Sequence, residues 1–288
     1  MEDELTAEIE INGKPILIKP GLEDCFWSDG VSLGSFDVVF PVLHGPNGED
    51  GTIQGLLKLL NIPVVGCGVL SSAVSMDKDT TKRLLEAAGI GVSRWMLLRR
   101  NQTLPSLAMV QNELSEVLFV KPSNMGSSVG VHRVTNEEEW QEALEDAFKY
   151  DHRVLVEEEI VGREVECAVL GNDDPIASGI GEVSSGNFYS YDEKYDDTST
   201  AELTIPANVE AELLGKLQSV AVQAYKVLQC AGLSRVDMFI APSGRIYVNE
   251  VNTMPGFTSI SMYPKLWEQE GLSYSDLVST LISLALET

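Results

Sequence analysis

The chain has 288 residues, 44% of them apolar, and a formal net charge of −24 at pH 7. This length allows two or three domains, and the excess of acid argues against nucleic acid as a partner, since a phosphate backbone requires clustered Lys and Arg. No run approaches about 18 apolar residues and no signal pattern opens the chain, so we expect a cytoplasmic protein without a membrane partner. The four cysteines are scattered without a CxxC motif, which predicts free thiols.

The first part of the chain predicts a parallel α/β unit. Residues 36–43 form a nearly continuous apolar run, typical of a strand buried on both faces of a parallel sheet. A helical pattern over 53–60 and a strand pattern over 62–65 complete a βαβ unit. Ligands bind beyond the carboxyl ends of such strands, where His44 lies, although a single histidine there is more often structural.

Two lysine-bearing segments follow. Residues 76–88 predict a helix in which Lys78 and Lys82 lie one turn apart, as on a solvated face. Further on, an apolar strand leads to Lys121 and to a Ser/Gly/Asn loop at 123–130. This loop is rich in donors and could cover a polyphosphate, but it is not the P-loop pattern, and a plain turn is the alternative.

The middle of the chain contains a capping pattern, an acidic bend and a long polar segment. Thr135 and Glu138 predict a capping box at a helix start.

Glutamates at 157–159, and at 164 and 166, flank a bend between two strands; they are either solvated or accept hydrogen bonds from ligand donors. Residues 182–201 are polar and aromatic, and a connection of this length is typical of a lid or a disordered loop.

An antiparallel hairpin near the C-terminus is the strongest local signal. Residues 235–240 and 245–252 alternate apolar and polar side chains around a Pro-Ser-Gly turn. The register that we expect from this turn sets Asp237 opposite Val248 and Arg235 opposite Glu250.

The hairpin predicts a divalent metal site. Because side chains alternate faces with period two, Asp237, Glu250 and Asn252 share one face, with Arg235 beside them. Two carboxylates and an amide oxygen without Cys or His suit Mg²⁺ or Mn²⁺, whereas the alternative is a solvated acidic face. The turn at 253–256 follows directly and frees backbone N–H groups that could bind an anion.

Seven blocks follow one another along the chain: HGPNGEDGTIQG, SMDKDTTK, VKPSNMGSSVGV, VEEEIVGREVE, YSYDEKY, RVDMF and VNEVNTMPGFTSIS. In order and spacing they resemble the signature blocks of the D-alanine:D-alanine ligase family of ATP-grasp enzymes. The resemblance implies a mixed α/β (α+β) ATP-grasp fold with an N-terminal parallel α/β domain at 1–66, a central domain at 67–161 and a C-terminal domain at 162–288. The family's N-terminal Gly-rich block has no counterpart here, so we expect the first domain to be truncated.

The resemblance also implies roles for single residues toward ATP and two Mg²⁺ (or Mn²⁺) ions. The phosphates would be bound by Lys78, Lys121 and Lys194. Adenine would be contacted by Glu157 and Ile160, and the ribose by Glu164. The ions would be bound by Asp237, Glu250 and Asn252.

The implied substrates are two molecules of D-alanine. His44 would lie near the first and Ser261 would bind the carboxylate of the second, while Arg235 and Gly256 would form an oxyanion hole and Ser127 and Tyr195 a link that closes the loop. The reaction would be ATP-dependent formation of D-alanyl-D-alanine through an acyl phosphate, for peptidoglycan precursor synthesis, by a possible homodimer. The alternatives are a ligase for other amino or hydroxy acids and a truncated ATP-binding remnant without catalysis.

Overall fold

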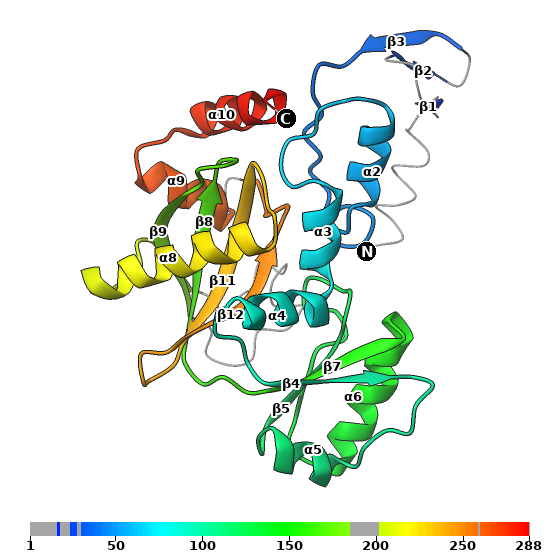
Figure 1. Ribbon diagram of the computed structural model, residues 1–288, viewed down its shortest axis with the longest axis vertical. Helices are drawn as coiled ribbons and strands as arrows, with labels where there is room; N and C mark the ends of the chain where they lie inside the picture. The colour runs from blue at the N-terminus through cyan, green and yellow to red at the C-terminus, as the bar shows by residue number, and fades with distance from the viewer. Residues whose placement is uncertain (1–15, 18–23, 28–29, 185–201, 259, 288) are drawn as a thin grey trace.

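The protein is described by a computed structural model that is mixed α/β, as predicted, and contains three sheets among its described residues (Figure 1). The described residues are 16–17, 24–27, 30–184, 202–258 and 260–287. Within them, no helix is both long and apolar enough to cross a bilayer. Cys67, Cys167 and Cys230 are buried free thiols, which confirms the prediction for these three cysteines.

The N-terminal part carries a small antiparallel sheet and two helices. These elements are β1 (Ile16–Leu17), β2 (Asp24–Trp27), β3 (Ser32–Ser35), α2 (Thr52–Leu59) and α3 (Val69–Met76). The order of the sheet is β1-β2-β3. The helix predicted over 53–60 is confirmed by α2.

The parallel strand predicted over 36–43 is wrong for the described structure. A single parallel bridge joins Val39 to Val64, with the Val39 N–H donating to the Pro63 carbonyl at 2.9 Å. Pro41 has no N–H with which to extend a ladder, and Val42 is 55% exposed, so this segment is not buried on both faces.

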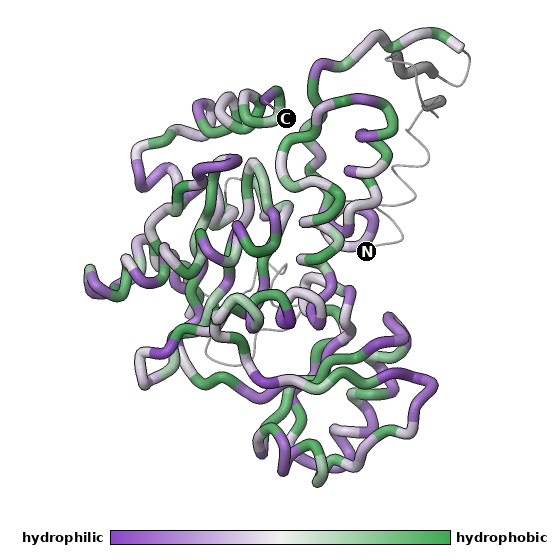
Figure 2. Tube along the Cα trace, in the orientation of Figure 1, coloured by the Kyte–Doolittle hydropathy of each residue, from purple (hydrophilic) through white to green (hydrophobic). Residues whose placement is uncertain are grey.

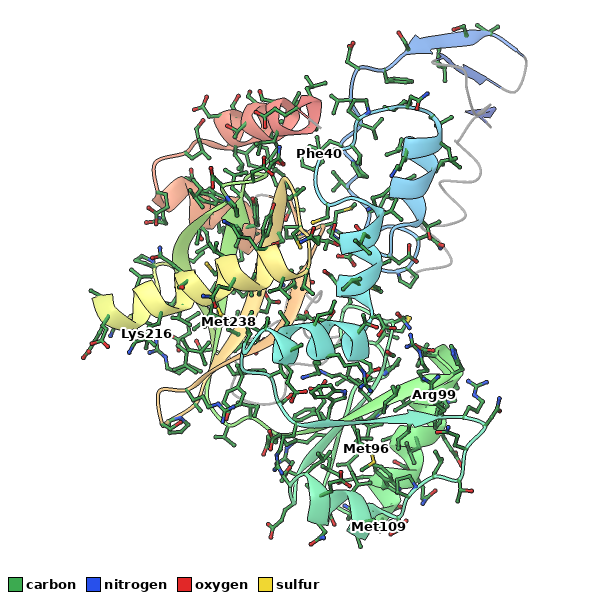
Figure 3. All side chains as sticks on the ribbon, in the orientation of Figure 1. Phe40, Met96, Arg99, Met109, Lys216 and Met238 are labelled. Atoms are coloured by element: carbon green, nitrogen blue, oxygen red, sulfur yellow. The ribbon has the colours of Figure 1, made fainter. Side chains whose placement is uncertain are left out.

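The central sheet is antiparallel with the order β4-β7-β5-β6. Its elements are β4 (Trp95–Arg99), α5 (Leu107–Glu113), β5 (Leu118–Pro122), β6 (His132–Val134), α6 (Glu137–Tyr150) and β7 (Arg153–Glu158). The cap of α6 lies one residue later than predicted, because Asn136 rather than Thr135 is the N-cap and accepts from the Glu139 N–H. Figure 3 shows Met96 among the side chains that fill the space between this sheet and its helices.

The third and largest sheet has the order β10-β9-β8-β11-β12. Its strands and associated helices are α4 (Lys78–Ala87), β8 (Arg163–Leu170), β9 (Ile176–Ser184), β10 (Glu202–Thr204), α8 (Ala211–Val227), β11 (Leu233–Ile240), β12 (Ile246–Asn252), α9 (Met262–Gln269) and α10 (Tyr274–Leu286). One face packs against α8 and the other against α9 and α10. Hydrophobic and hydrophilic residues alternate along α8 in Figure 2, as in an amphipathic helix.

The cores connect segments that are distant in the sequence. Met238 lies beneath α8 in Figure 3, in a core that also contains Leu85 of α4. Phe40 packs edge-on against Phe257, with ring centroids 5.1 Å apart, and so ties the N-terminal part to the C-terminal core. The domain boundaries at residues 66 and 161 stay predictions.

The β11–β12 hairpin differs from the predicted register. Asp237 pairs with Glu250 and Met238 with Val248, so a β-bulge leaves Asn249 as the extra residue. Without the bulge, Asp237 would pair with Asn249 and share its face. The bulge moves the partner of Asp237 by one residue to Glu250, so that Asp237 and Glu250 lie on one face, as the sequence predicted.

Candidate active site

A cavity of about 580 Å³ lies between the central and the largest sheet. Its volume is typical of small-molecule sites. Most of the residues predicted to bind a nucleotide line it: Lys78, Lys121, Glu157, Ile160 and Glu164, together with Ser127 and Glu250. Residues 185–201, and with them Lys194 and Tyr195, lie outside the described residues.

Strand alternation builds the acidic face at one side of the cavity. Val236 and Met238 of β11 enter the core beneath α8, so Arg235 and Asp237 project from the opposite face. The Arg235 guanidinium donates twice to the Asp237 carboxylate, at 2.7 Å each, and its Nε lies 3.0 Å from an oxygen of Glu166.

Charge around Arg235 explains its ionisation. Burial favours a lower pKa for Arg235, but the carboxylates of Asp237 and Glu166 outweigh burial and raise it well above the ordinary value. Arg235 is therefore a fixed cation. Glu166 is a site residue that the sequence analysis did not assign, although its place two residues after Glu164 on one strand was a usable signal.

The donor set of this face fits a hard divalent cation. Asn252 donates to Asp237 at 2.8 Å and to Glu250 at 3.4 Å, so the amide holds the two carboxylates together. All three side chains offer oxygen, the atom that Mg²⁺ prefers. Within the described ranges, no cluster of three or more His, Cys, Asp or Glu side chains has the geometry of a metal site, so the fit rests on two carboxylates and one amide.

Two lysines and one glutamate form a cluster at the opposite side of the cavity, which Lys121 and Glu157 line and Lys82 does not. The Lys121 Nζ lies 3.0 Å from one oxygen of Glu157, and the Lys82 Nζ lies 3.4 Å from the other. Ser93 accepts from Lys82 at 2.7 Å and donates to Glu157 at 3.2 Å. Glu157 and Lys82 are only 4% and 1% exposed, so the prediction of a solvated face is wrong for Lys82.

The ionisation of this cluster follows from burial and pairing. Burial favours a higher pKa for Glu157, but Lys121 and Lys82 act more strongly and lower it below the ordinary value. Burial lowers the pKa of Lys82 to about 8, although Glu157 opposes this. Glu157 is thus an anion that faces two cationic groups.

Lys78 extends from the start of α4 to the Ser/Gly loop. Its Nζ donates to the Met125 carbonyl, and its backbone N–H donates to the Ser123 carbonyl at 3.0 Å. Burial lowers the pKa of Lys78, against the opposing charge of Glu250. Ser127, in the same loop, has a φ of 54°, a left-handed conformation that non-glycine residues adopt only in special turns.

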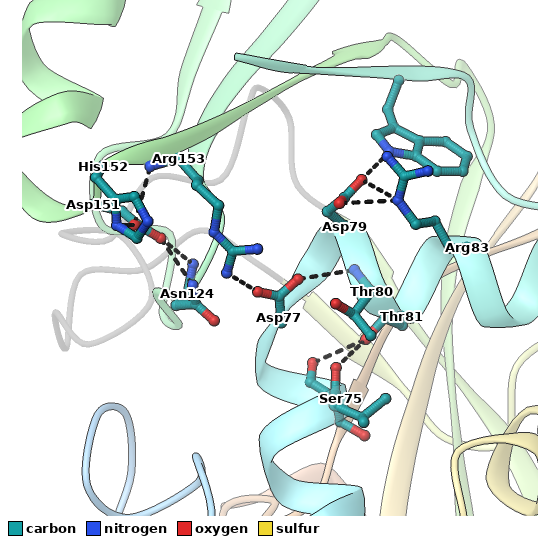
Figure 4. Close-up of polar contacts among 12 residues, drawn as sticks. Ser75, Asp77, Asp79, Thr80, Thr81, Arg83, Asn124, Asp151, His152 and Arg153 are labelled. Atoms are coloured by element: carbon teal, nitrogen blue, oxygen red, sulfur yellow. Dashed lines mark hydrogen bonds and ion pairs between the residues drawn. The ribbon is translucent and has the colours of Figure 1, made fainter. Parts of the chain in front are cut away.

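A network of polar contacts fixes the base of this loop (Figure 4). Asp77 caps α4 and forms an ion pair with the Arg153 guanidinium. The Arg153 carbonyl accepts from the Ser123 N–H at 3.0 Å, and Asp151 accepts from the backbone and the side chain of Asn124 at 3.0 Å each. The network thereby fixes α4, which bears Lys78, relative to the loop.

The loop after residue 43 lies against the end of the hairpin. The Leu43 N–H contacts the Met254 sulfur at 3.2 Å, and the Thr253 hydroxyl lies 3.5 Å from the Glu49 carbonyl. His44 is exposed at the start of this loop. Burial raises the pKa of Glu49 to about 7 although its carboxylate accepts from the Gly45 N–H at 2.6 Å.

Gly256 and Ser261, predicted for the oxyanion hole and for the second substrate, are neighbours. A Cβ on Gly256 would be 2.8 Å from the Ser261 hydroxyl oxygen, so any side chain there would displace it. The Ser261 hydroxyl accepts from the Thr258 N–H at 3.0 Å, which fixes its orientation.

Known proteins resemble this chain over most of its length. The family model described as the D-ala D-ala ligase C-terminus matches residues 84–283, and that of the D-ala D-ala ligase N-terminus matches 22–67. D-alanine–D-alanine ligase A of Escherichia coli (strain K12) is 52% identical over 261 residues, which cover 90% of this chain and 72% of that protein. The D-alanine–D-alanine ligase of Shouchella clausii is 50% identical over 289 residues, which cover 98% of this chain and 78% of that protein.

Two solved structures share the fold. The D-alanine-D-alanine ligase from Coxiella burnetii has a TM-score of 0.83 and 40% identity, covering 99% of this chain and 78% of that one. The VanG D-Ala:D-Ser ligase from Enterococcus faecalis has a TM-score of 0.88 and 42% identity, covering 98% and 82%. By its sequence and its structure, the chain belongs to the D-Ala-D-Ala ligase family.

Proposed function

We propose that the protein joins two D-alanines into D-alanyl-D-alanine at the expense of ATP, in the cytoplasm, as a step in peptidoglycan precursor synthesis. The observation that carries this proposal is the cavity between two sheets, which is lined by lysines on one side and on the other by Glu250, whose carboxylate belongs to the Asp237–Glu250–Asn252 face. This arrangement suits a ligand with a polar ring at one end and a polyphosphate at the other. Membership of the family supplies the substrate class.

The two sides of the cavity have different tasks toward ATP. Lys78 and Lys121 neutralise phosphate oxygens, and Glu157, Ile160 and Glu164 provide contacts for adenine and ribose. Mg²⁺ bound by the acidic face would supply neutralisation of the charge that develops on the transferred phosphoryl group.

The first chemical step activates a carboxylate. One carboxylate oxygen of the first D-alanine attacks the γ-phosphorus, the bond to the β-phosphate oxygen breaks, and ADP leaves, which produces an acyl phosphate. Arg235, fixed by Asp237 and Glu166, lies beside the acidic face as a cation for this carboxylate. Lys194 and Tyr195 are proposed to approach from the segment outside the described residues.

The second step forms the peptide bond. The amine of the second D-alanine attacks the acyl carbon, the carbonyl oxygen becomes an oxyanion, and phosphate then leaves with one oxygen of the original carboxylate while the amine loses a proton. Arg235 and the Gly256 N–H stabilise this oxyanion, and removal of one such donor costs roughly 2.7 to 4 kcal/mol. Ser261 binds the carboxylate of the second substrate and orients its amine.

A second candidate concerns only the second substrate. The likeness to a D-Ala:D-Ser ligase, at a TM-score of 0.88, favours a test of D-serine as the nucleophile. The two candidates share the first step and differ in the product.

Phosphate release with product identification tests the proposal. The purified protein is incubated with ATP and Mg²⁺ and with one of the substrates D-alanine, D-serine or D-lactate. In further incubations D-alanine is combined with D-serine or with D-lactate. We expect phosphate release that depends on D-alanine, and D-alanyl-D-alanine as the product by mass spectrometry. Binding of ATP without release on addition of D-alanine would instead support a non-catalytic remnant, and gel filtration with light scattering would test the proposed homodimer.

A further inference from the structure

Lys82 is a buried lysine that the proposed chemistry does not use. It lies one helical turn after Lys78 but is 1% exposed and is not among the residues that line the cavity. Its ammonium group lies 3.4 Å from Glu157, donates to Ser93 and is 5.7 Å from the centre of the Trp95 ring. A lysine this deeply buried is uncommon unless it is paired, and Glu157 is the carboxylate that pairs with Lys82.

The arrangement around Glu157 is asymmetric. Lys121 approaches the carboxylate from the cavity, which both residues line, and Lys82 approaches the other oxygen from the protein interior. One negative charge thus faces two positive charges, and the cluster has an excess charge of one cation. Lys121 is the lysine that a nucleotide can reach.

Engagement of a phosphate by Lys121 disturbs this pairing. The Lys121 ammonium must then share or leave the Glu157 carboxylate, from which it is 3.0 Å. A buried carboxylate that loses its only cationic partner is strongly destabilised, because the lost interaction is not replaced by water. With Lys82 in place, Glu157 keeps a cation when Lys121 moves.

We propose that Lys82 is a positioning residue that remains as the counter-ion of Glu157 and so makes Lys121 available to the phosphates of the nucleotide. This inference rests on the proposed nucleotide site but not on the ligase reaction. It predicts that Lys82 matters for phosphate recognition, although it touches no phosphate, and that its effect depends on the charge of Glu157.

Binding measurements with ADP·Mg²⁺ and with adenosine test the proposal. Lys82→Met keeps the aliphatic stem and removes the charge, and we expect it to weaken ADP binding by at least about tenfold while adenosine binding changes by less than about threefold. Lys82→Gln, which retains a hydrogen-bond donor for Ser93, should show the same pattern. The control Lys216→Met removes an exposed lysine, paired with Glu212 on α8, and should leave both affinities unchanged.

The double variant Lys82→Met/Glu157→Gln separates charge compensation from a structural role. Because Glu157 also contacts adenine in the proposed site, the double variant is compared with Glu157→Gln alone, where no carboxylate charge needs Lys82, and there Lys82→Met should change the affinity for ADP by less than about threefold. A loss of ADP affinity from Lys82→Met that is as large in the Glu157→Gln background as in the wild type, or equal losses for ADP and adenosine, would overturn the proposal. Thermal unfolding of each variant shows whether it is folded.

These outcomes are distinct from failure of the proposed function. A wild-type protein that binds ADP but forms no dipeptide would refute the ligase reaction and leave the role of Lys82 open to the same measurements. A wild-type protein that does not bind ADP at all would contradict both.

Discussion

Glu49 gives a quantitative test of the site's electrostatics. Burial raises the pKa of Glu49 from 4.5 to about 7, with Glu250 acting in the same direction and the Gly45 N–H against it. Because the folded-state pKa is raised, the contribution of this carboxyl group to stability is fully present below pH 4.5 and is lost as the pH rises through about 7. At about 1.36 kcal/mol per pKa unit, the loss amounts to at most about 3 kcal/mol.

The substitution Glu49→Gln removes this titration and keeps an oxygen that can accept from Gly45. We expect the variant to be more stable than the wild type at pH 8 by up to about 3 kcal/mol, and within about 1 kcal/mol of it at pH 5. Urea unfolding at both pH values, without nucleotide or Mg²⁺, measures the difference, and Glu138→Gln, at an exposed position, is the control. A difference between wild type and Glu49→Gln that is the same at pH 5 and pH 8 would refute the reasoning.

Three further substitutions probe the site. Gly256→Ala displaces the Ser261 hydroxyl, so KM for the second D-alanine should rise roughly tenfold or more while ADP binding is retained; unchanged kinetics would contradict the adjacency of the two residues. Arg153→Met frees Asp77 and the base of the loop, and KM for ATP should rise more than KM for D-alanine, whereas equal changes would indicate a general loss of structure. Asp237→Asn should raise the Mg²⁺ concentration needed for half-maximal activity, and an unaltered Mg²⁺ dependence would exclude Asp237 as a ligand.

Much of the C-terminal site could be predicted from strand alternation. The alternating pattern of the hairpin was sufficient to group Asp237, Glu250 and Asn252 with Arg235, and their contacts confirm this face. The pairing was not predictable, because the bulge at Asn249 carries no glycine or other local signal. The predicted face was therefore right although the predicted register was wrong.

Other features depend on contacts between distant segments. Lys82 looks like a surface residue in an amphipathic helix, and only the packing of α4 against the central sheet brings it to Glu157, 75 residues later. Residues 36–43 have the composition of a buried strand, but strand formation needs neighbouring strands, and the described structure offers one bridge. Glu49 acquires its raised pKa from burial beside the hairpin, which the sequence could not indicate.

The fate of the carboxylate oxygen of D-alanine tests the account most directly. The protein is incubated with ATP, Mg²⁺ and D-alanine that carries ¹⁸O in its carboxylate, and the released phosphate is analysed by mass spectrometry. If an acyl phosphate forms between the two sheets, each dipeptide formed is accompanied by one phosphate that contains a single ¹⁸O atom from the substrate. Phosphate without ¹⁸O would show that ATP is hydrolysed by water, and would contradict the role given to this cavity.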